Sequence, residues 1–104
     1  MTEKRKVLIT GGAGLIGSIM IDKLGDKYEF SSLDLKEADG IKSTVANLGD
    51  LEAINPAFDG IDTVVHLAAD RSPKGSWDSI LKNNFVATYN VFEASKRAGV
   101  KRVI

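Results

Sequence analysis

A glycine-rich segment near the N-terminus constrains the fold of this chain more than any other feature. Thr10-Gly11-Gly12-Ala13-Gly14-Leu15-Ile16-Gly17 directly follows the apolar run Val7-Leu8-Ile9, which has the pattern of a buried strand. After the glycines, helical spacing places five apolar residues on one face of a helix that ends near Gly25: Leu15, Ile16, Ile19, Met20 and Leu24. The segment therefore predicts a tight turn from a strand into a helix, because glycine lets the main chain turn sharply and approach another group closely.

The start of this predicted helix is an anion-binding site that needs no basic side chain. Its first N–H groups have no partner within the helix, and the helix dipole adds a partial positive charge. A P-loop is excluded because Ser18 stands where that motif requires lysine. Asp34 follows Gly14 by 20 residues, at the end of a second strand pattern. This is the separation expected for a carboxylate that holds the adenosine ribose, so the sequence predicts dinucleotide binding.

The same carboxylate bears on which dinucleotide is bound. A negative charge at Asp34 would repel the 2′-phosphate of NADP, so we expect NAD to be the cofactor. Lys36 lies close by in the sequence and could accept that phosphate, so NADP is the less favoured alternative.

Strand and helix patterns alternate along the whole chain. We expect further strands at residues 28–35, 41–46, 62–69 and from 103 onward, with helices at 50–57 and 77–98. This alternation predicts an α/β fold, a Rossmann-type doubly wound parallel sheet with strand order near 3-2-1-4-5. We expect residues 1–104 to form a single dinucleotide-binding domain with no substrate domain. The last strand is expected to be incomplete at the C-terminus, as in the front part of a larger fold.

The predicted helix at 77–98 carries an unusually wide apolar face. One stripe contains Asn84, Ala87 and Val91, and the stripe beside it contains Phe85 and Phe92. A sheet alone does not cover so wide a face, so we expect a homo-oligomer that forms through this helix. Asn84 needs a partner, because an unpaired buried amide costs about 1–3 kcal/mol. It either bonds main chain near an active site or tethers the helix to the sheet.

Composition excludes several other classes of function. The 14 Lys and Arg residues balance 14 Asp and Glu residues, so we expect neither nucleic acid nor a membrane as a partner. The chain has no cysteine and a single histidine, His66, so we expect no metal site. His66 lies in a buried strand pattern and is expected to be a core residue rather than a catalytic one. Four glycines interrupt the apolar stretch after the basic residues 4–6, which excludes a secretory signal and makes the cytoplasm the expected location.

Several segments together resemble the extended short-chain dehydrogenase/reductases, the NAD-dependent epimerase/dehydratase group. Residues 10–17 are similar to the TGGAGxIG loop of that family, and Val65-His66-Leu67-Ala68-Ala69 is similar to its HLAA segment. Residues 84–91 resemble its N-x-x-G-T-x-N-V helix, with Ala87 in place of glycine. Asn47-Leu48 stands where the family has Asp-Leu or Asp-Ile beside the adenine. Residues 70–83 resemble uronate dehydrogenases and related sugar-acting members.

The resemblance implies a set of cofactor-binding positions and no catalytic one. In that family a Tyr-x-x-x-Lys pair transfers the proton, but Tyr28 is followed by Ser32 and Tyr89 by Glu93. The residues expected to bind the cofactor are Gly11, Gly14, Leu15, Ile16, Gly17, Asp34, Leu35, Asn47, Leu48, Leu67, Ala68, Ala69 and Asn84.

The function implied is that of the NAD-binding portion of a sugar-type oxidoreductase or epimerase. In its full-length form such a protein transfers hydride to or from nicotinamide and takes a sugar or sugar nucleotide as substrate. Two alternatives remain from the sequence. The chain is a non-catalytic nucleotide-binding or sensing module, or it is a truncated product that is inactive by itself.

Overall fold

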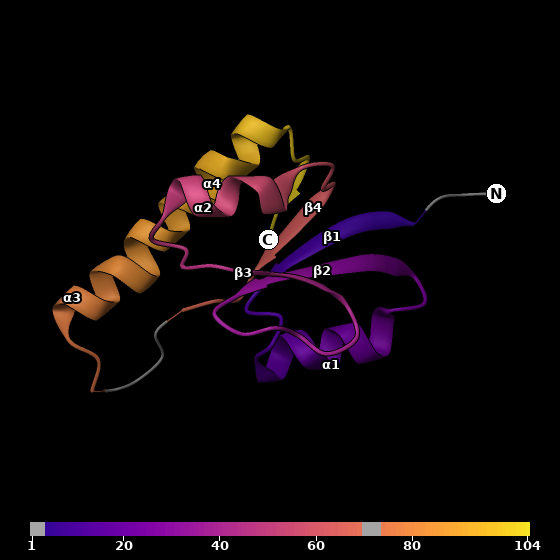
Figure 1. The fold of residues 1–104 in the computed structure, drawn as a ribbon, viewed down its shortest axis with the longest axis horizontal. Coiled ribbons are helices and arrows are strands. Elements are labelled where there is room, and N and C mark those ends of the chain that lie inside the picture. Colours follow the sequence, from indigo (N-terminus) through magenta and orange to yellow (C-terminus); the bar gives the residue numbers. More distant parts are fainter. Residues whose placement is uncertain (1–3, 70–73) are drawn as a thin grey trace.

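Five parallel strands form one sheet in the order β3-β2-β1-β4-β5 (Figure 1), which confirms the predicted topology. The computed structural model describes residues 4–69 and 74–104. The strands are β1 (Arg5–Thr10), β2 (Tyr28–Asp34), β3 (Lys42–Val45), β4 (Thr63–His66) and β5 (Arg102–Val103). The chain builds outward from β1 to β3 on one side and then returns to place β4 on the other side of β1. A crevice forms where the order reverses, at the carboxyl ends of β1 and β4.

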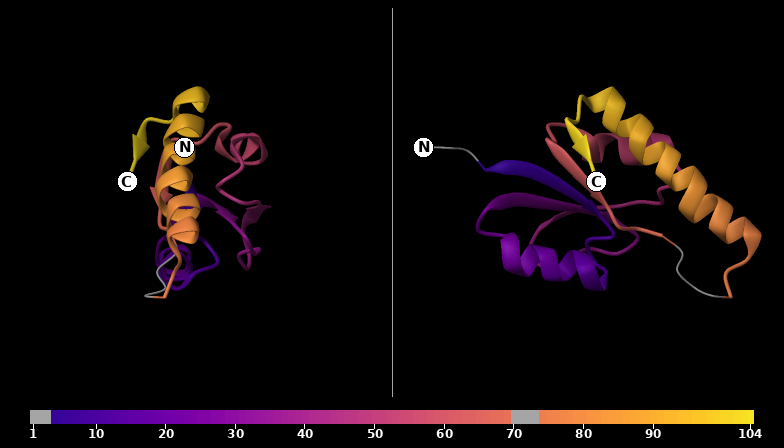
Figure 2. Two further views of the ribbon diagram at one scale, coloured as in Figure 1. Left: turned by 90° about the vertical axis from the view of Figure 1, so that its left-hand side faces the viewer. Right: turned by 180° about the vertical axis from the view of Figure 1, so that it is seen from behind.

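Helices cover both faces of this sheet, as a doubly wound fold requires (Figures 1 and 2). One face carries α1 (Leu15–Leu24). The other carries α2 (Leu51–Ile54), the 3₁₀ turn η1 (Asn55–Phe58) and α4 (Ala87–Ala98). Asp50 caps α2 by accepting the N–H of Ala53 at 3.2 Å.

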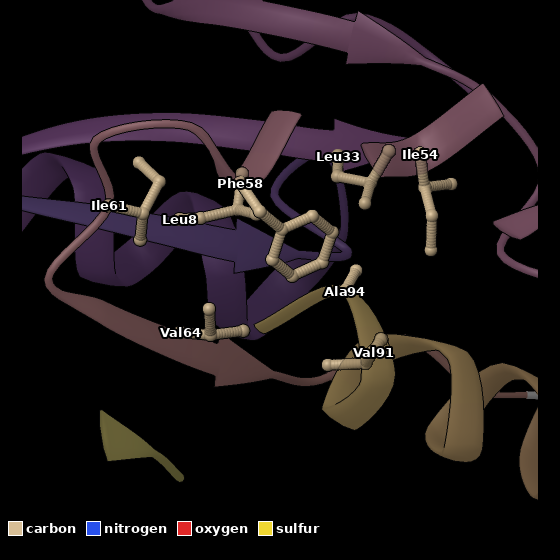
Figure 3. Close-up of a cluster of buried hydrophobic side chains, with 8 residues drawn as sticks. All are labelled: Leu8, Leu33, Ile54, Phe58, Ile61, Val64, Val91 and Ala94. Atoms are coloured by element: carbon tan, nitrogen blue, oxygen red, sulfur yellow. The ribbon is translucent and has the colours of Figure 1, made fainter. Parts of the chain in front are cut away.

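Each face has its own apolar core because neighbouring residues of a strand point to opposite sides. Figure 3 shows the larger core, with the Phe58 ring in the middle of a buried cluster. Its members are Leu8, Leu33, Ile54, Phe58, Ile61, Val64, Val91 and Ala94. The smaller core joins Val7, Ile9, Phe30 and Val65 to the partly buried Met20, Ile21 and Leu24 of α1.

The face that α1 buries differs from the one that its apolar spacing predicts. Met20 and Leu24 pack on the sheet, whereas Leu15, Ile16 and Ile19 are at least half exposed. Gly17 is the buried residue of α1 and lies against the main chain of Gly11 and Gly12. The buried face of α1 is therefore centred on that glycine. The first turn of α1 therefore presents apolar side chains outward at the carboxyl edge of the sheet.

The helix predicted at 77–98 is continuous but not uniform. It consists of α3 (Trp77–Ile80), a π-helical segment η2 (Leu81–Val86) and α4. Ser76 caps its start by accepting the N–H of Ser79 at 3.1 Å, and Gly99 ends it with φ of 76°. Its α3 end projects beyond the sheet (Figures 1 and 2).

An ion-pair cluster joins β4 to β5 at the opposite edge of the sheet from the crevice. Asp62 accepts a hydrogen bond from the Thr63 hydroxyl at 2.7 Å and one from Arg102 at 3.0 Å, and it lies 3.8 Å from the Lys101 ammonium. The Thr63 hydrogen bond, followed by attraction to Arg102, Lys101 and Arg5, lowers the pKa of Asp62.

This shift predicts how stability depends on pH. Because the pKa of Asp62 is lower in the folded state, its contribution is present above the unfolded value of 3.8 and is lost as pH falls through the folded value. We expect Asp62→Asn to flatten the decline of unfolding free energy below pH 5, measured by urea denaturation. A decline identical to that of the unmodified chain would contradict this role.

Candidate functional site

A cavity of about 480 Å³ opens at the carboxyl ends of β1, β2, β3 and β4. It collects residues that lie far apart in the sequence, from the glycine loop to the helix that follows β4. Twelve of the thirteen residues predicted to bind the cofactor line it: Gly11, Gly14, Leu15, Ile16, Gly17, Asp34, Leu35, Asn47, Leu48, Leu67, Ala68 and Ala69. Ala46 and Asn83 also line it.

The glycine loop forms one wall of the cavity, and the absence of side chains permits its shape. Gly11 has φ of +82°, and a Cβ there would lie 3.2 Å from the N atom of Ala68. At Gly17 a Cβ would lie 2.6 Å from the carbonyl oxygen of Gly11. Gly14 precedes α1, and no side chain in the described residues caps that helix. The first N–H groups of α1 are therefore available to an anion in the cavity.

Gly12 has a different role from the three glycines that line the cavity. A Cβ at this position would overlap the side chain of Ser32 on β2. Gly12 is buried and lets the loop pack directly on the sheet. It is a packing residue, and the cavity-facing glycines are Gly11, Gly14 and Gly17.

Asp34 lies at the end of β2, beside the glycine loop. Its Oδ2 accepts the N–H of Ala13 at 3.1 Å, and its Oδ1 accepts the N–H of Leu35 at 2.7 Å. These two bonds fix the carboxylate at the cavity and leave further lone pairs on both oxygens. Asp34 is the one charged residue among those described that line the cavity. The described part of the lining thus offers acceptors for hydroxyl groups and no cation for an additional phosphate.

The segment after β3 forms the far end of the cavity. Ala46, Asn47 and Leu48 provide two apolar side chains and one amide. Asn90, buried on α4, donates from Nδ2 to the carbonyl oxygen of Leu48 at 2.8 Å and so holds this segment in place. Asn90 is not among the residues predicted for the site. The signal for it was present, because Asn90 falls on the same buried helical face as Ala87 and Ala94.

Thr10, which ends β1, holds the residues that follow β4 beside the glycine loop. Its Oγ1 accepts the N–H of Leu67 at 3.0 Å and that of Ala68 at 3.2 Å. With both acceptor positions used, the hydroxyl donates its own proton to Nδ1 of His66 at 2.7 Å. This set of bonds positions the main chain of Leu67 and Ala68 along the cavity.

His66 connects this arrangement to the long helix. The Thr88 hydroxyl donates to the carbonyl oxygen of Asn84, so it accepts from Nε2–H of His66 at 3.1 Å. The imidazole is therefore neutral, with its proton on Nε2. Burial lowers the pKa of His66, which favours the same neutral form. His66 is half-buried, and both of its ring nitrogens form hydrogen bonds with side chains of other elements. This agrees with the expected structural role.

Asn84 is the one predicted site residue that does not line the cavity; its neighbour Asn83 does. Both lie in η2, where hydrogen bonds reach five residues instead of four. This wider turn rotates the preceding residues relative to α-helical spacing. Asn83 is held by a bond from its Nδ2 to the Ser79 hydroxyl at 3.0 Å.

Two further structural findings bear on the predicted partners. Across residues 4–69 and 74–104, no group of three potential ligand side chains is placed to hold a metal ion. Within the same residues, no helix combines the length and apolar character needed to cross a membrane. Part of the segment that resembles uronate dehydrogenases, residues 70–73, lies outside the described residues.

The fold is a Rossmann-type α/β fold, and its cavity lies at the carboxyl edge of the sheet, where such folds bind ligands. The model of the NAD dependent epimerase/dehydratase family matches residues 7–104. The chain therefore belongs to this family, as its motifs had indicated.

Several of the proteins similar to this chain are named as dehydrogenases. L-Arabinose 1-dehydrogenase (NAD(P)(+)) of Haloferax volcanii is 34% identical over 95% of this chain and 39% of its own length. A mutant uronate dehydrogenase from Agrobacterium tumefaciens, complexed with NAD, has a TM-score of 0.85 and 29% identity over 97% of this chain and 40% of its own. MoeE5 in complex with UDP-glucose and NAD has a TM-score of 0.79 and 30% identity over 94% of this chain and 34% of its own. The chain thus spans about 40% of the length of the first curated relatives.

Proposed function

We propose that this chain binds NAD in the cavity at the carboxyl edge of the sheet. The observation that carries the proposal is the order of groups along three adjacent strands. The amides at the start of α1 follow β1, the carboxylate of Asp34 ends β2, and the apolar segment with Asn47 follows β3. These groups match, in sequence, a diphosphate, a ribose and a base. The volume of about 480 Å³ is in the range of small-molecule and cofactor sites.

The individual residues fit the cofactor as follows. Gly11, Gly14 and Gly17, with the N–H groups of Leu15 and Ile16, would hold the diphosphate. Asp34 would accept the ribose hydroxyls. Its negative charge, with no cation among the described residues that line the cavity, favours NAD over NADP. Leu67, Ala68 and Ala69 would lie along the middle of the cofactor. When bound, NAD supplies a nicotinamide that accepts or donates hydride.

For the whole protein we propose hydride transfer on a sugar or sugar nucleotide. The names of its relatives support this class, since they act on L-arabinose and uronates, and one solved structure holds UDP-glucose. They do not favour a non-catalytic sensing module. On this proposal residues 1–104 are one dinucleotide-binding domain of a cytoplasmic enzyme, and substrate contacts and proton transfer lie with other residues.

Isothermal titration of the chain with NAD and NADP tests this proposal. We expect one NAD site per chain and about tenfold weaker binding of NADP, because Asp34 faces the position of the 2′-phosphate. Absence of NAD binding by a chain that circular dichroism shows to be folded would refute the proposal. An NADP affinity above that of NAD would refute the assignment of the cofactor.

We also propose that the helix at 77–98 mediates self-association. Ala87, Val91 and Ala94 are buried against the sheet, whereas the neighbouring stripe is exposed. Its exposed members are Trp77, Leu81, Phe85, Tyr89 and Phe92. A contiguous apolar surface of this kind is typical of an interface. We expect a dimer by sedimentation velocity and a shift toward monomer in Phe92→Glu; a monomer at all concentrations would contradict this.

A further inference from the structure

A chain of side-chain hydrogen bonds lies behind the cavity and joins two parts of its lining. One part is the main chain of residues 67–68, which follows β4, and the other is Asn83 of η2. The connecting residues, Thr10, His66 and Thr88, belong to β1, β4 and α4. None of the three is among the described residues that line the cavity. Any effect of these bonds on a ligand is therefore exerted through the lining residues that they hold.

Each bond in this chain has a fixed donor and a fixed acceptor. The Thr10 hydroxyl accepts the N–H groups of residues 67–68, so its own proton goes to Nδ1 of His66 at 2.7 Å. The Thr88 hydroxyl donates to the carbonyl oxygen of Asn84, so it accepts from Nε2 of His66 at 3.1 Å. One tautomer of the neutral imidazole, with its proton on Nε2, satisfies both hydroxyl groups at once.

The two threonine hydroxyls therefore depend on each other through the imidazole that lies between them. Removing the Thr10 hydroxyl removes the donor that holds Nδ1 unprotonated, and with it the reason for the proton to stay on Nε2. Removing the Thr88 hydroxyl removes the acceptor for that proton and leaves the His66 ring less constrained. Side-chain networks of this kind stabilise a structure by more than the sum of their separate pairs.

The far end of the chain of bonds lies where the long helix changes its geometry. The N–H of Ala87 bonds to the carbonyl oxygens of both Lys82 and Asn84, at the boundary between η2 and α4. The Thr88 hydroxyl bonds the same oxygen of Asn84. Single π-helical turns of this kind are rare and are frequently found at functional sites. The bond from Thr88 therefore holds the turn that brings Asn83 to the cavity.

We infer that Thr10, His66 and Thr88 act together as positioning residues for NAD. They hold the main chain after β4 and the π-helical segment in one relative position, and the NAD affinity depends on that position. The inference rests on the proposed function, because NAD is the ligand whose affinity it concerns. It assigns no contact with the cofactor to any of the three residues. Their contribution is shared, so it is lost when a single bond of the chain is removed.

Calorimetric titration of valine and serine variants with NAD tests this inference. Valine has nearly the shape of threonine without the hydroxyl group, whereas serine retains the hydroxyl group. We expect Thr10→Val to weaken NAD binding about tenfold and Thr88→Val about fivefold. Thr10→Ser and Thr88→Ser should stay within about twofold of the unmodified chain. Thr63→Val is the matched control, because it makes the same change at the start of β4, where the hydroxyl bonds Asp62, and it should leave the NAD affinity unchanged.

The double variant Thr10→Val/Thr88→Val distinguishes a shared role from two separate ones. If both hydroxyls act through one imidazole, the double variant should bind NAD about tenfold more weakly than the unmodified chain, as Thr10→Val does. Independent effects would multiply to a loss of about fiftyfold, and that result would overturn the inference. Urea denaturation of each variant establishes that the titrated protein is folded.

NMR of the imidazole nitrogens gives a test that needs no variant, because His66 is the single histidine of the chain. At about pH 8, where the ring is neutral, we expect the proton on Nε2 and an unprotonated Nδ1. The Nδ1 signal should also shift in Thr88→Val, although Thr88 bonds the other nitrogen.

The outcomes separate this inference from the proposed function. A proton on Nδ1 of His66, or losses of affinity that multiply in the double variant, would overturn the inference and leave NAD binding in place. If the unmodified chain does not bind NAD, the proposed function is wrong and the inference is wrong with it.

Discussion

Gly17→Ala is expected to weaken NAD binding by about a hundredfold, which corresponds to about 2.7 kcal/mol. The added methyl would lie 2.6 Å from the carbonyl oxygen of Gly11 and 2.9 Å from Cα of Gly12. Both are main-chain atoms of the loop and cannot rotate away as a flexible side chain could. The start of α1 must therefore move away from the loop, and its N–H groups would no longer converge on one anion. We expect a loss of stability of about 1–3 kcal/mol from the same overlap.

Titration calorimetry gives the affinity, and urea denaturation gives the stability. Gly40→Ala is the control for a methyl group added away from the cavity, because a Cβ at Gly40 would meet nothing within 4 Å. Unlike Gly17, Gly40 has a positive φ, of 78°. Gly40→Ala is expected to cost about 1–2 kcal/mol from backbone strain and to leave the NAD affinity unchanged. If Gly17→Ala binds NAD within about threefold of the unmodified chain, the close approach of α1 to the loop is not what forms the site.

The cavity could be predicted from the sequence because its parts follow strand ends. In a parallel sheet all carboxyl ends meet at one edge, so identifying the strands already brings Gly14, Asp34, Asn47 and Ala68 together. Spacing within a strand–turn–helix unit is short and leaves little freedom. The positions of these residues therefore depended on few assumptions about packing.

The structure differs from the sequence-based expectations at Asn84 and on α1, and the physical reasons lie in the geometry of the helices. Asn84 was predicted as a site residue from the resemblance of residues 84–91 to the family's helix. In the structure it lies in η2, whose hydrogen bonds reach five residues, and its neighbour Asn83 lines the cavity. Ile16 and Ile19 are apolar but exposed, because the buried face of α1 is set by the close approach at Gly17 rather than by hydrophobicity. Helical periodicity shows which face of a helix is apolar. It does not show which residue of the helix packs most closely on the rest of the fold.

Long-range polar contacts were also beyond prediction. The bond from Asn90 to Leu48 spans 42 residues, and that from Thr10 to His66 spans 56 residues. Each bond depends on how two separate elements are placed in the folded chain. Neither sequence segment indicates which residue will be its partner. The burial of Asn90 could be anticipated from its helical face, but its partner could not.

Asp34→Ala is expected to weaken NAD binding by about 10- to 100-fold. The carboxylate is the charged acceptor of the cavity, and hydrogen bonds to charged groups are worth about 1.5–3 kcal/mol. Its Oδ2 also accepts the N–H of Ala13 at 3.1 Å, so the substitution releases one side of the glycine loop. Asp34→Asn has one oxygen for the N–H groups of Ala13 and Leu35, so it keeps one of these two bonds and is expected to lose less affinity than Asp34→Ala. Calorimetry on both variants therefore separates the contact with ribose from the support of the loop.

The same variants address the choice between NAD and NADP. Removing the negative charge removes the repulsion of a 2′-phosphate, so NADP should lose less affinity than NAD, or gain some, in Asp34→Asn. Asp39→Asn is the charge-matched control, because Asp39 is exposed and does not line the cavity. It should leave the ratio of the NADP and NAD affinities unchanged, because it removes a negative charge outside the cavity. An NADP-to-NAD ratio that stays constant in Asp34→Asn would show that the cavity discriminates against the phosphate by shape, and Asp34 would then serve the ribose alone.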